Sequence, residues 1–230
     1  MRITIPHFYD FGQQGAELGD ALNTPQAWDS LRTGSPGAFA MATDCDAWEQ
    51  QSRQNSIVRT RAKDLCNELA TLGARSLASY GVGGAILEYW VRELSPDLAL
   101  TITENAPATL SRLELFFPEA AVALHDILNE DPVSADVHLL HRIDTEFSND
   151  ELSRIIARLQ NETVIVIATR LLDLRAVLGE LRQRLKPGAT RAGLQRTRAV
   201  FEETWRDSHA IERHSFGDLE GWILTPKVRR

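Results

Sequence analysis

The residues whose types and spacing could do chemistry follow three short apolar segments. The first group is glycine-rich: Ser79-Tyr80-Gly81-Val82-Gly83-Gly84-Ala85, between the apolar segment 76–80 and a helix-like segment, 85–94. Glycines after a strand permit a tight turn and the close approach of a ligand, and a helix that follows offers unpaired N–H groups. The turn therefore predicts a site for the polar part of a cofactor; the alternative is a tight turn without a ligand.

An acidic residue follows each of the next two apolar segments. Glu104 comes after 98–103, where a carboxylate would accept hydrogen bonds from ribose hydroxyls. Asp126 comes after 120–124, where a carboxylate could accept a hydrogen bond from an exocyclic amine while Ile127 packs on a base. The alternatives are a solvated loop acid for Glu104 and a turn cap for Asp126.

Strand-like and helix-like segments alternate behind these residues. The expected strands are 76–80, 98–103, 120–124, 136–140, 163–168, 209–216 and 220–225, and the expected helices are 56–72, 85–94, 107–116, 148–159, 171–185 and 192–206. Continuous β-branched residues in 163–168 are typical of a central parallel strand. The alternation predicts a doubly wound α/β sheet, and a hairpin at Gly217-Asp218 would make the last strand antiparallel.

On these motifs the chain resembles the class I S-adenosylmethionine-dependent methyltransferases from about Leu72 to Pro226. The resemblance consists of the glycine motif at Gly81, Gly83 and Ala85, the two acids, the strand Val164–Ala168 and the terminal strand pair. It implies a Rossmann-like, mostly parallel seven-stranded sheet with an antiparallel last strand, and S-adenosylmethionine as the cofactor. A nicotinamide cofactor fits less well, because the two-strand ending and the third-strand acid favour the methyl donor.

The resemblance also implies a donor site. Gly81 and Gly83 would approach the methionine part of the donor, Glu104 would hold the ribose, and Asp126 with Ile127 would hold the adenine. The full expected donor site is Ser79, Tyr80, Gly81, Gly83, Glu104, Asn105, Asp126, Ile127 and Leu140. The family has an acid where this chain has Ser79, which adds no charge. A methyltransferase-like partner or scaffold protein without catalysis is therefore the alternative.

His141 and Asp144 are the catalytic candidates. His141 ends the fourth expected strand, and a subset of small-molecule O-methyltransferases carries a base His followed closely by an acid at this place. Here the spacing is one residue shorter, so the alternatives are a His141 without a chemical role and an Asp144 that faces solvent. Of the neighbours, His138 is expected to pack in the core, and Glu88 to be a charge on a helix face.

Residues 1–55 are expected to form an N-terminal extension of short helices and loops, distinct from a Rossmann-like domain at 56–230. Glycines, prolines and scattered aromatic residues mark this segment. It is either a packing extension or a lid over a ligand pocket.

The composition of the chain limits the classes of partner that it is expected to bind. The net charge of -7 disfavours a general nucleic-acid binder, although 170–206 holds nine Lys or Arg residues. That stretch is either a set of solvated helix faces or a site for an anionic acceptor or carrier. Two cysteines without a CxxC motif predict no metal and a cytoplasmic protein, and no apolar run is long enough for a membrane span.

The expected activity is methyl transfer from S-adenosylmethionine to a small-molecule acceptor, with O-methylation as one form of it. An RNA or protein methyltransferase is the weaker alternative, since no amine-methylating motif such as Asn-Pro-Pro-Tyr is present. A homodimer is left open.

Overall fold

A computed structural model describes residues 2–10, 24–34, 39–186 and 188–227. The strands are β1 (Thr4–Asp10), β2 (Ser76–Tyr80), β3 (Ala99–Glu104), β4 (Ala121–Leu124), β5 (Val137–His141), β6 (Thr163–Ile167), β7 (Ala189–Arg196), β8 (His209–Phe216) and β9 (Leu219–Pro226). The helices are α2 (Pro25–Thr33), α3 (Cys45–Gln54), α4 (Ser56–Thr71), α5 (Ile86–Leu94), α6 (Pro107–Phe116), α7 (Asn149–Arg158), α8 (Leu174–Arg184) and α9 (Arg198–Trp205).

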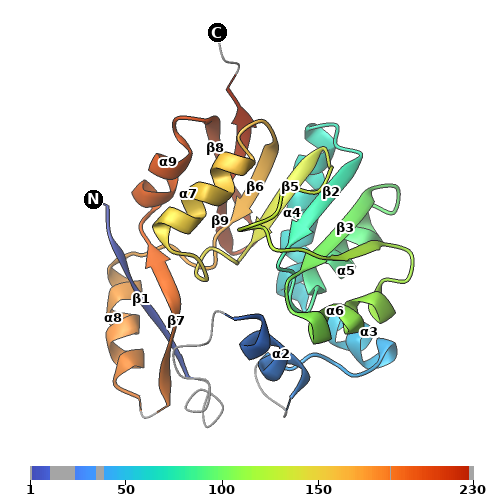
Figure 1. Ribbon diagram of the computed structural model, residues 1–230, viewed down its shortest axis with the longest axis horizontal. Helices are drawn as coiled ribbons and strands as arrows, with labels where there is room; N and C mark the ends of the chain where they lie inside the picture. Colours follow the sequence, from blue (N-terminus) through green and yellow to red (C-terminus); the bar gives the residue numbers. More distant parts are fainter. Residues whose placement is uncertain (1, 11–23, 35–38, 187, 228–230) are drawn as a thin grey trace.

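The main sheet has seven strands in the order β4-β3-β2-β5-β6-β9-β8 (Figure 1). Strands β2 to β6 pair in parallel, whereas β9 is antiparallel to both β6 and β8. This confirms the predicted α/β fold with its reversed last strand. The strand order reverses between β2 and β5, and ligands of such sheets bind at the carboxyl ends of the strands at this point.

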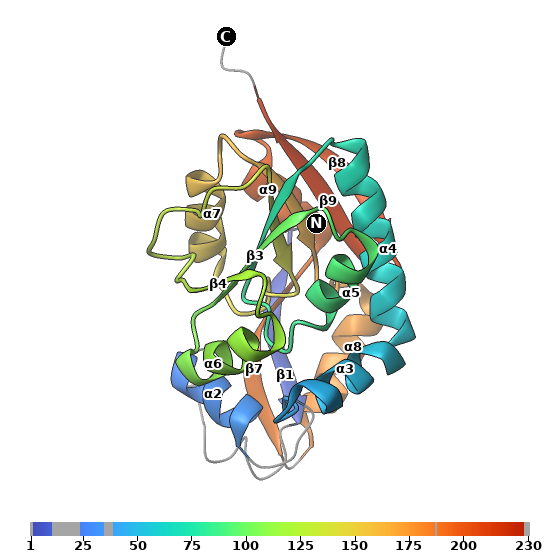
Figure 2. The ribbon, with the colours of Figure 1, turned by 90° about the vertical axis from the view of Figure 1, so that its right-hand side faces the viewer.

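The central strands are apolar on both faces because helices cover both faces. Successive side chains of a strand point to opposite sides, so Leu77 and Leu139 pack under α4 and α5, whereas Ala78 and Leu140 pack under α7 and α9. Figure 2 shows these two helix layers with the sheet between them. The layers hold β2 and β5 in place and therefore fix where their carboxyl ends project.

Residues 189–196 form strand β7, so the helix predicted at 192–206 is wrong in its first part and begins only at Arg198. Strand β7 pairs with β1, antiparallel, in a separate two-stranded sheet. The N-terminal segment thus contains a strand as well as the expected helices. Pairing with a distant segment outweighs local propensity here.

The two-stranded sheet lies against the loop that follows β5. Leu194 N donates to Thr145 O at 2.8 Å, and a Cβ on Gly193 would lie 2.0 Å from the same oxygen. Gly193, with φ of +121°, therefore permits an approach that a side chain would block. This docking places β1 and β7 beside the carboxyl end of the main sheet. Across the described ranges, no helix is both long enough and apolar enough to cross a membrane.

Candidate active site

The glycine turn follows β2 as predicted, and its backbone is left-handed at Gly81 (φ +62°) and Gly83 (φ +58°). Gly81 N donates to Thr103 O at 2.9 Å, which fixes the turn to β3. A Cβ on Gly81 would lie 2.9 Å from Ile143 Cγ2, and a Cβ on Gly83 would lie 3.2 Å from Arg32 Nη2. The left-handed backbone favours glycine at both positions, and at Gly81 the close approach of Ile143 favours it as well.

Glu104 is not a solvated loop acid, because its side chain is only 2% exposed. Oε1 accepts hydrogen bonds from Asn105 N (2.9 Å) and Ala106 N (3.2 Å). Oε2 accepts from Gly83 N (3.0 Å) and from Arg32 Nη1 (2.8 Å). The carboxylate thus joins the glycine turn to the end of β3, and both of its oxygens are engaged.

Arg32, in the last turn of α2, is a site residue that the sequence did not indicate. Its guanidinium pairs with Glu104 and lies 4.8 Å from the Trp28 ring centroid. Asp29 ties α2 to α6 by accepting hydrogen bonds from Thr109 N and Oγ1 at 2.8 and 3.0 Å. Arg32 therefore occupies one oxygen of the carboxylate that the sequence predicts to hold ribose hydroxyls. No local signal could have revealed it, since 72 residues separate the partners.

Beyond Glu104, a small cavity of about 40 Å³ is lined by Asn105, His125, Asp126 and Ile127. Asp126 caps its own turn, accepting from Leu128 N (2.9 Å) and Asn129 Nδ2 (2.6 Å), which is the alternative stated for it above. His125 Nε2 is buried and has no hydrogen-bond partner among the described residues. The expected adenine-binding residues thus lie together, around a narrow space.

A larger cleft of about 450 Å³ opens on the other side of the glycine turn. Its walls come from the turn, from the loop after β5 and from aromatic residues of the N-terminal segment. These aromatic residues are Tyr9, Trp28, Phe39 and Trp48. Tyr9 and Trp28 contact Phe39 edge-on, with ring centroids 5.1 and 5.7 Å apart. The cleft therefore has an apolar, aromatic side next to the polar turn.

His141 lines this cleft from the end of β5. Its Nε2 is buried and, within the described part of the chain, has no hydrogen-bond partner. Burial, with Arg142 and Arg61 nearby, lowers the pKa of His141 to about 3. The imidazole is therefore neutral near pH 7 and has a nitrogen free to accept a hydrogen bond.

Asp144 does not orient His141, and it does not face solvent. It is 3% exposed, and Oδ1 accepts hydrogen bonds from Thr169 N and Oγ1 at 2.7 and 2.8 Å. No hydrogen bond joins Asp144 to His141 in the described ranges. The predicted pair is therefore not formed; Asp144 fixes the segment after β6 instead.

Glu88 is buried beneath the glycine turn, which corrects the prediction of a helix-face charge. It is 2% exposed, and Ser79 Oγ donates to its Oε1 at 2.6 Å. Burial raises the pKa of Glu88 to about 7. A carboxyl group therefore lies beside Ser79, although the position itself carries no acid.

The remaining predicted residues belong mainly to the core. Leu140 is 2% exposed and packs against α7 and α9. Tyr80 is 1% exposed and its hydroxyl bonds to His138 Nδ1 at 3.0 Å, so His138 packs in the core as expected. The Tyr80 ring also lines the small cavity, whereas Leu140 lines neither cavity.

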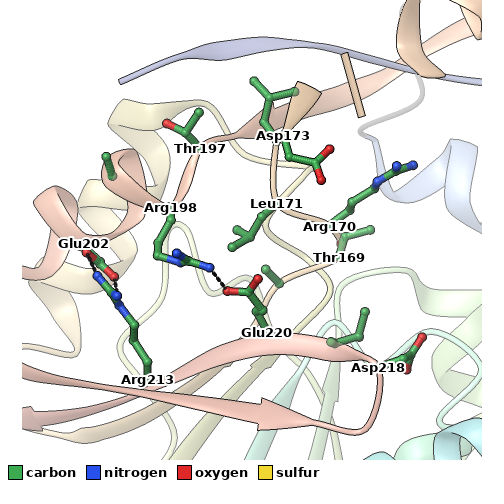
Figure 3. A pocket seen from close by; sticks show the side chains of 14 residues that line it. Thr169, Arg170, Leu171, Asp173, Thr197, Arg198, Glu202, Arg213, Asp218 and Glu220 are labelled. Atoms are coloured by element: carbon green, nitrogen blue, oxygen red, sulfur yellow. Dashed lines mark hydrogen bonds and ion pairs between the residues drawn. The ribbon is translucent and has the colours of Figure 1, made fainter. Parts of the chain in front are cut away.

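A second pocket, about 590 Å³, lies between β6, α9 and the β8–β9 hairpin (Figure 3). Its charges are largely paired: Arg213 Nε lies 2.6 Å from Glu202, and Arg198 pairs with Glu220. Arg196, from the same basic stretch, is fully buried and donates to the Asp144 and Phe147 carbonyls. Arg196 and Arg198 of the basic stretch therefore make contacts within the fold.

Solved structures with this architecture match the chain over most of its length. They include human N-acetylserotonin methyltransferase in complex with SAM, at TM-score 0.60 and 15% identity, over 80% of this chain and 55% of that one. The chain has the fold of the class I S-adenosylmethionine-dependent methyltransferases. The mitomycin 7-O-methyltransferase MmcR matches at TM-score 0.59 and 18% identity, over 78% of this chain and 60% of that one.

PigF with SAH matches at TM-score 0.60 and 14% identity, over 80% of this chain and 60% of that one. The chain thus spans 55 to 60% of the length of these three structures. No protein-family model matches the sequence, and no curated protein matches it.

Proposed function

We propose that the chain is a methyltransferase that takes S-adenosylmethionine as its donor and a small molecule as its acceptor, with a hydroxyl oxygen as the accepting atom. The observation that carries the proposal is the contiguity of two spaces at the carboxyl end of β2 and β5. The narrow cavity beside Glu104 and the wide cleft beside His141 meet at the glycine turn. A donor and an acceptor would lie end to end across this turn.

The residues present fit the donor. Gly81 and Gly83 hold the turn in a left-handed conformation and line the cleft, and Glu104 is a buried carboxylate beside them. His125 has a buried, unpartnered Nε2 in the described part of the site, which a base nitrogen or amine could satisfy. Ribose hydroxyls would bind Glu104 in place of Arg32, so α2 or the Arg32 side chain must move first.

When bound, the donor supplies an electrophilic methyl group on a sulfonium. The residues of the chain bring the acceptor oxygen in line with it, and positioning of this kind lowers a reaction barrier by several kcal/mol (~7 kcal/mol in well-oriented systems). His141 Nε2 accepts the hydrogen bond of the acceptor hydroxyl and so orients its oxygen towards the methyl group. Because burial and Arg142 oppose a charge on His141, its pKa of about 3 keeps it neutral, and the hydroxyl proton leaves to water as the oxygen–methyl bond forms.

A protein with this fold that binds partners without catalysis is the second candidate. Two observations favour it: Arg32 already occupies Glu104, and Ser79 replaces the family's acid. In that case Arg32 is a permanent partner of Glu104, and the cavity beside Glu104 stays closed to ligands.

Calorimetric titration with S-adenosylhomocysteine separates the two candidates. Micromolar binding, weakened about tenfold or more by Glu104→Gln, supports the methyltransferase, because a hydrogen bond to a charged group contributes about 1.5–3 kcal/mol. Glu114→Gln, on the exposed side of α6, is the matched control and should bind like the wild type. Absence of binding at millimolar ligand would favour the second candidate.

A further inference from the structure

Arg142 adopts a backbone conformation that a residue with a side chain rarely takes. It follows His141 directly, and its φ of +60° lies in the left-handed region. Arg142 N donates to Ile167 O at 2.9 Å, and Thr169 Oγ1 donates to Arg142 O at 3.0 Å. Non-glycine residues held in this region gather at functional sites, because the surrounding structure must stabilise the conformation. With this backbone conformation, the Arg142 side chain lines the same cleft as His141.

The Arg142 guanidinium has no ion-pair or hydrogen-bond partner among the described residues. The nearby acids are already engaged: Asp218 accepts two hydrogen bonds from Arg61, at 2.8 and 3.1 Å, and Asp144 holds Thr169. The Arg142 side chain is exposed to solvent along the cleft, and desolvation by the surrounding protein together with the positive charge of Arg61 lowers its pKa. A cation in this position would be stabilised by an anion in the cleft.

The other basic side chains that line the cleft already have acidic partners. Arg32 pairs with Glu104, and His7 pairs with Glu180 at 2.9 Å. Burial raises the pKa of Glu146 to about 7, so its carboxyl is largely protonated below neutral pH. In the part of the cleft that the structure describes, Arg142 is therefore the cation without a counter-ion.

We propose that the cleft binds an aromatic carboxylate that also carries the accepting hydroxyl, and that Arg142 holds the carboxylate group. Tyr9, Trp28, Phe39 and Trp48 supply the apolar wall for the ring. A cleft of about 450 Å³ is within the range of small-molecule sites. A planar guanidinium pairs with a carboxylate through two parallel hydrogen bonds. The inference rests on the proposed function, because the cleft is then the acceptor site.

The test compares two ligands of the same shape and different charge, 4-hydroxybenzoate and 4-hydroxybenzamide, by ligand-observed NMR titration of the full chain. The wild type is expected to bind the carboxylate about tenfold more tightly than the amide. Arg142→Gln should abolish that preference while leaving amide binding unchanged, and Arg142→Lys should keep part of it because the charge remains.

Arg170→Gln is the matched control. Arg170 is an exposed arginine at the same end of the sheet, but it lines the second pocket and not this cleft (Figure 3). It should keep the wild-type preference. Equal affinity of the wild type for the two probes, a preference that survives Arg142→Gln, or no binding of either probe at millimolar concentration would each overturn the proposal.

Titration with S-adenosylhomocysteine distinguishes this failure from failure of the proposed function. Donor-product binding without a carboxylate preference would overturn the role of Arg142 alone. Carboxylate binding that depends on Arg142, with no binding of S-adenosylhomocysteine, would overturn the methyltransferase and leave the anion site.

Discussion

The Arg32–Glu104 ion pair leads to a prediction in which stability and ligand affinity change in opposite directions. Arg32→Met removes the hydrogen bond from Nη1 to Glu104 Oε2 (2.8 Å) and the cation 4.8 Å from the Trp28 ring. Methionine keeps most of the apolar length of the side chain. The variant therefore removes mainly the positive charge that is paired with Glu104.

The loss of stability follows from burial, since the two side chains are 9% and 2% exposed. Removing one partner of a buried pair costs about 3–5 kcal/mol. Glu104 keeps hydrogen bonds from Gly83, Asn105 and Ala106, so the lower end, about 3 kcal/mol, is expected. For a chain of this length the melting temperature should fall by roughly 6–12 °C.

The affinity for S-adenosylhomocysteine should rise about tenfold in the same variant, because ribose hydroxyls no longer have to displace a charged partner from Glu104. Calorimetry measures the affinity, and thermal unfolding with and without the ligand measures the stability. The ligand should therefore raise the melting temperature more in Arg32→Met than in the wild type.

Arg154→Met is the control. Arg154, in α7, is 59% exposed and lies 4.0 Å from Glu151, so its loss should change stability by less than about 1 kcal/mol and leave affinity unchanged. Weaker binding of S-adenosylhomocysteine by Arg32→Met would refute the reasoning, since it would mean that Arg32 contacts the ligand and does not compete with it.

Three further predictions follow from the site. Burial raises the pKa of Glu88 from its usual 4.5 to about 7, so the stability present below the lower value is lost as pH rises through the higher one. As the pH rises from about 5 to about 8, the free energy of unfolding of Glu88→Gln should therefore increase by about 2 kcal/mol relative to that of the wild type, as measured by urea unfolding. A parallel pH dependence of the two proteins would contradict this. The pKa of His141 is lowered to about 3, so in the folded protein His141 becomes protonated only as the pH falls towards that value. Its ring NMR signals should not titrate between about pH 5 and pH 8, and a midpoint near 6.5 would show that it is not buried as described. Gly81→Ala should destabilise the protein by about 1–3 kcal/mol, because its φ is +62° and its Cβ would contact a side chain, whereas Gly84→Ala, with open space around it, should not. Equal unfolding midpoints for the two variants would remove the steric argument.

The main sheet could be predicted because its information is local. Strand β6 is a continuous β-branched run, and the glycine turn lies between β2 and α5 where a strand ends and a helix begins. Each of these patterns depends on a few adjacent residues. Strand β7 could not be predicted in this way, because its partner β1 lies at the other end of the chain and its own residues do not alternate in polarity.

The expected pair of His141 and Asp144 failed for a related reason. Spacing along the chain places the two close together, but the backbone turns at Arg142 into the left-handed region. Asp144 then lies against Thr169, and His141 is left with neutral, apolar and cationic neighbours. The left-handed φ of Arg142, which no residue type at this position indicates, is part of the backbone path that separates the two side chains.

Arg32 links the two halves of the site, because it lines both the small cavity beside Glu104 and the large aromatic cleft. A ligand hydroxyl that replaces Arg32 on Glu104 must therefore move a residue that also forms the wall of the cleft, together with the Trp28 ring beneath it. Occupation of one cavity would then change the shape of the other. Since such coupling is reciprocal in free energy, an acceptor that displaces Arg32 from the cleft side would favour the donor to the same extent. The N-terminal segment, which carries no motif, would thus supply the connection between the two proposed binding events.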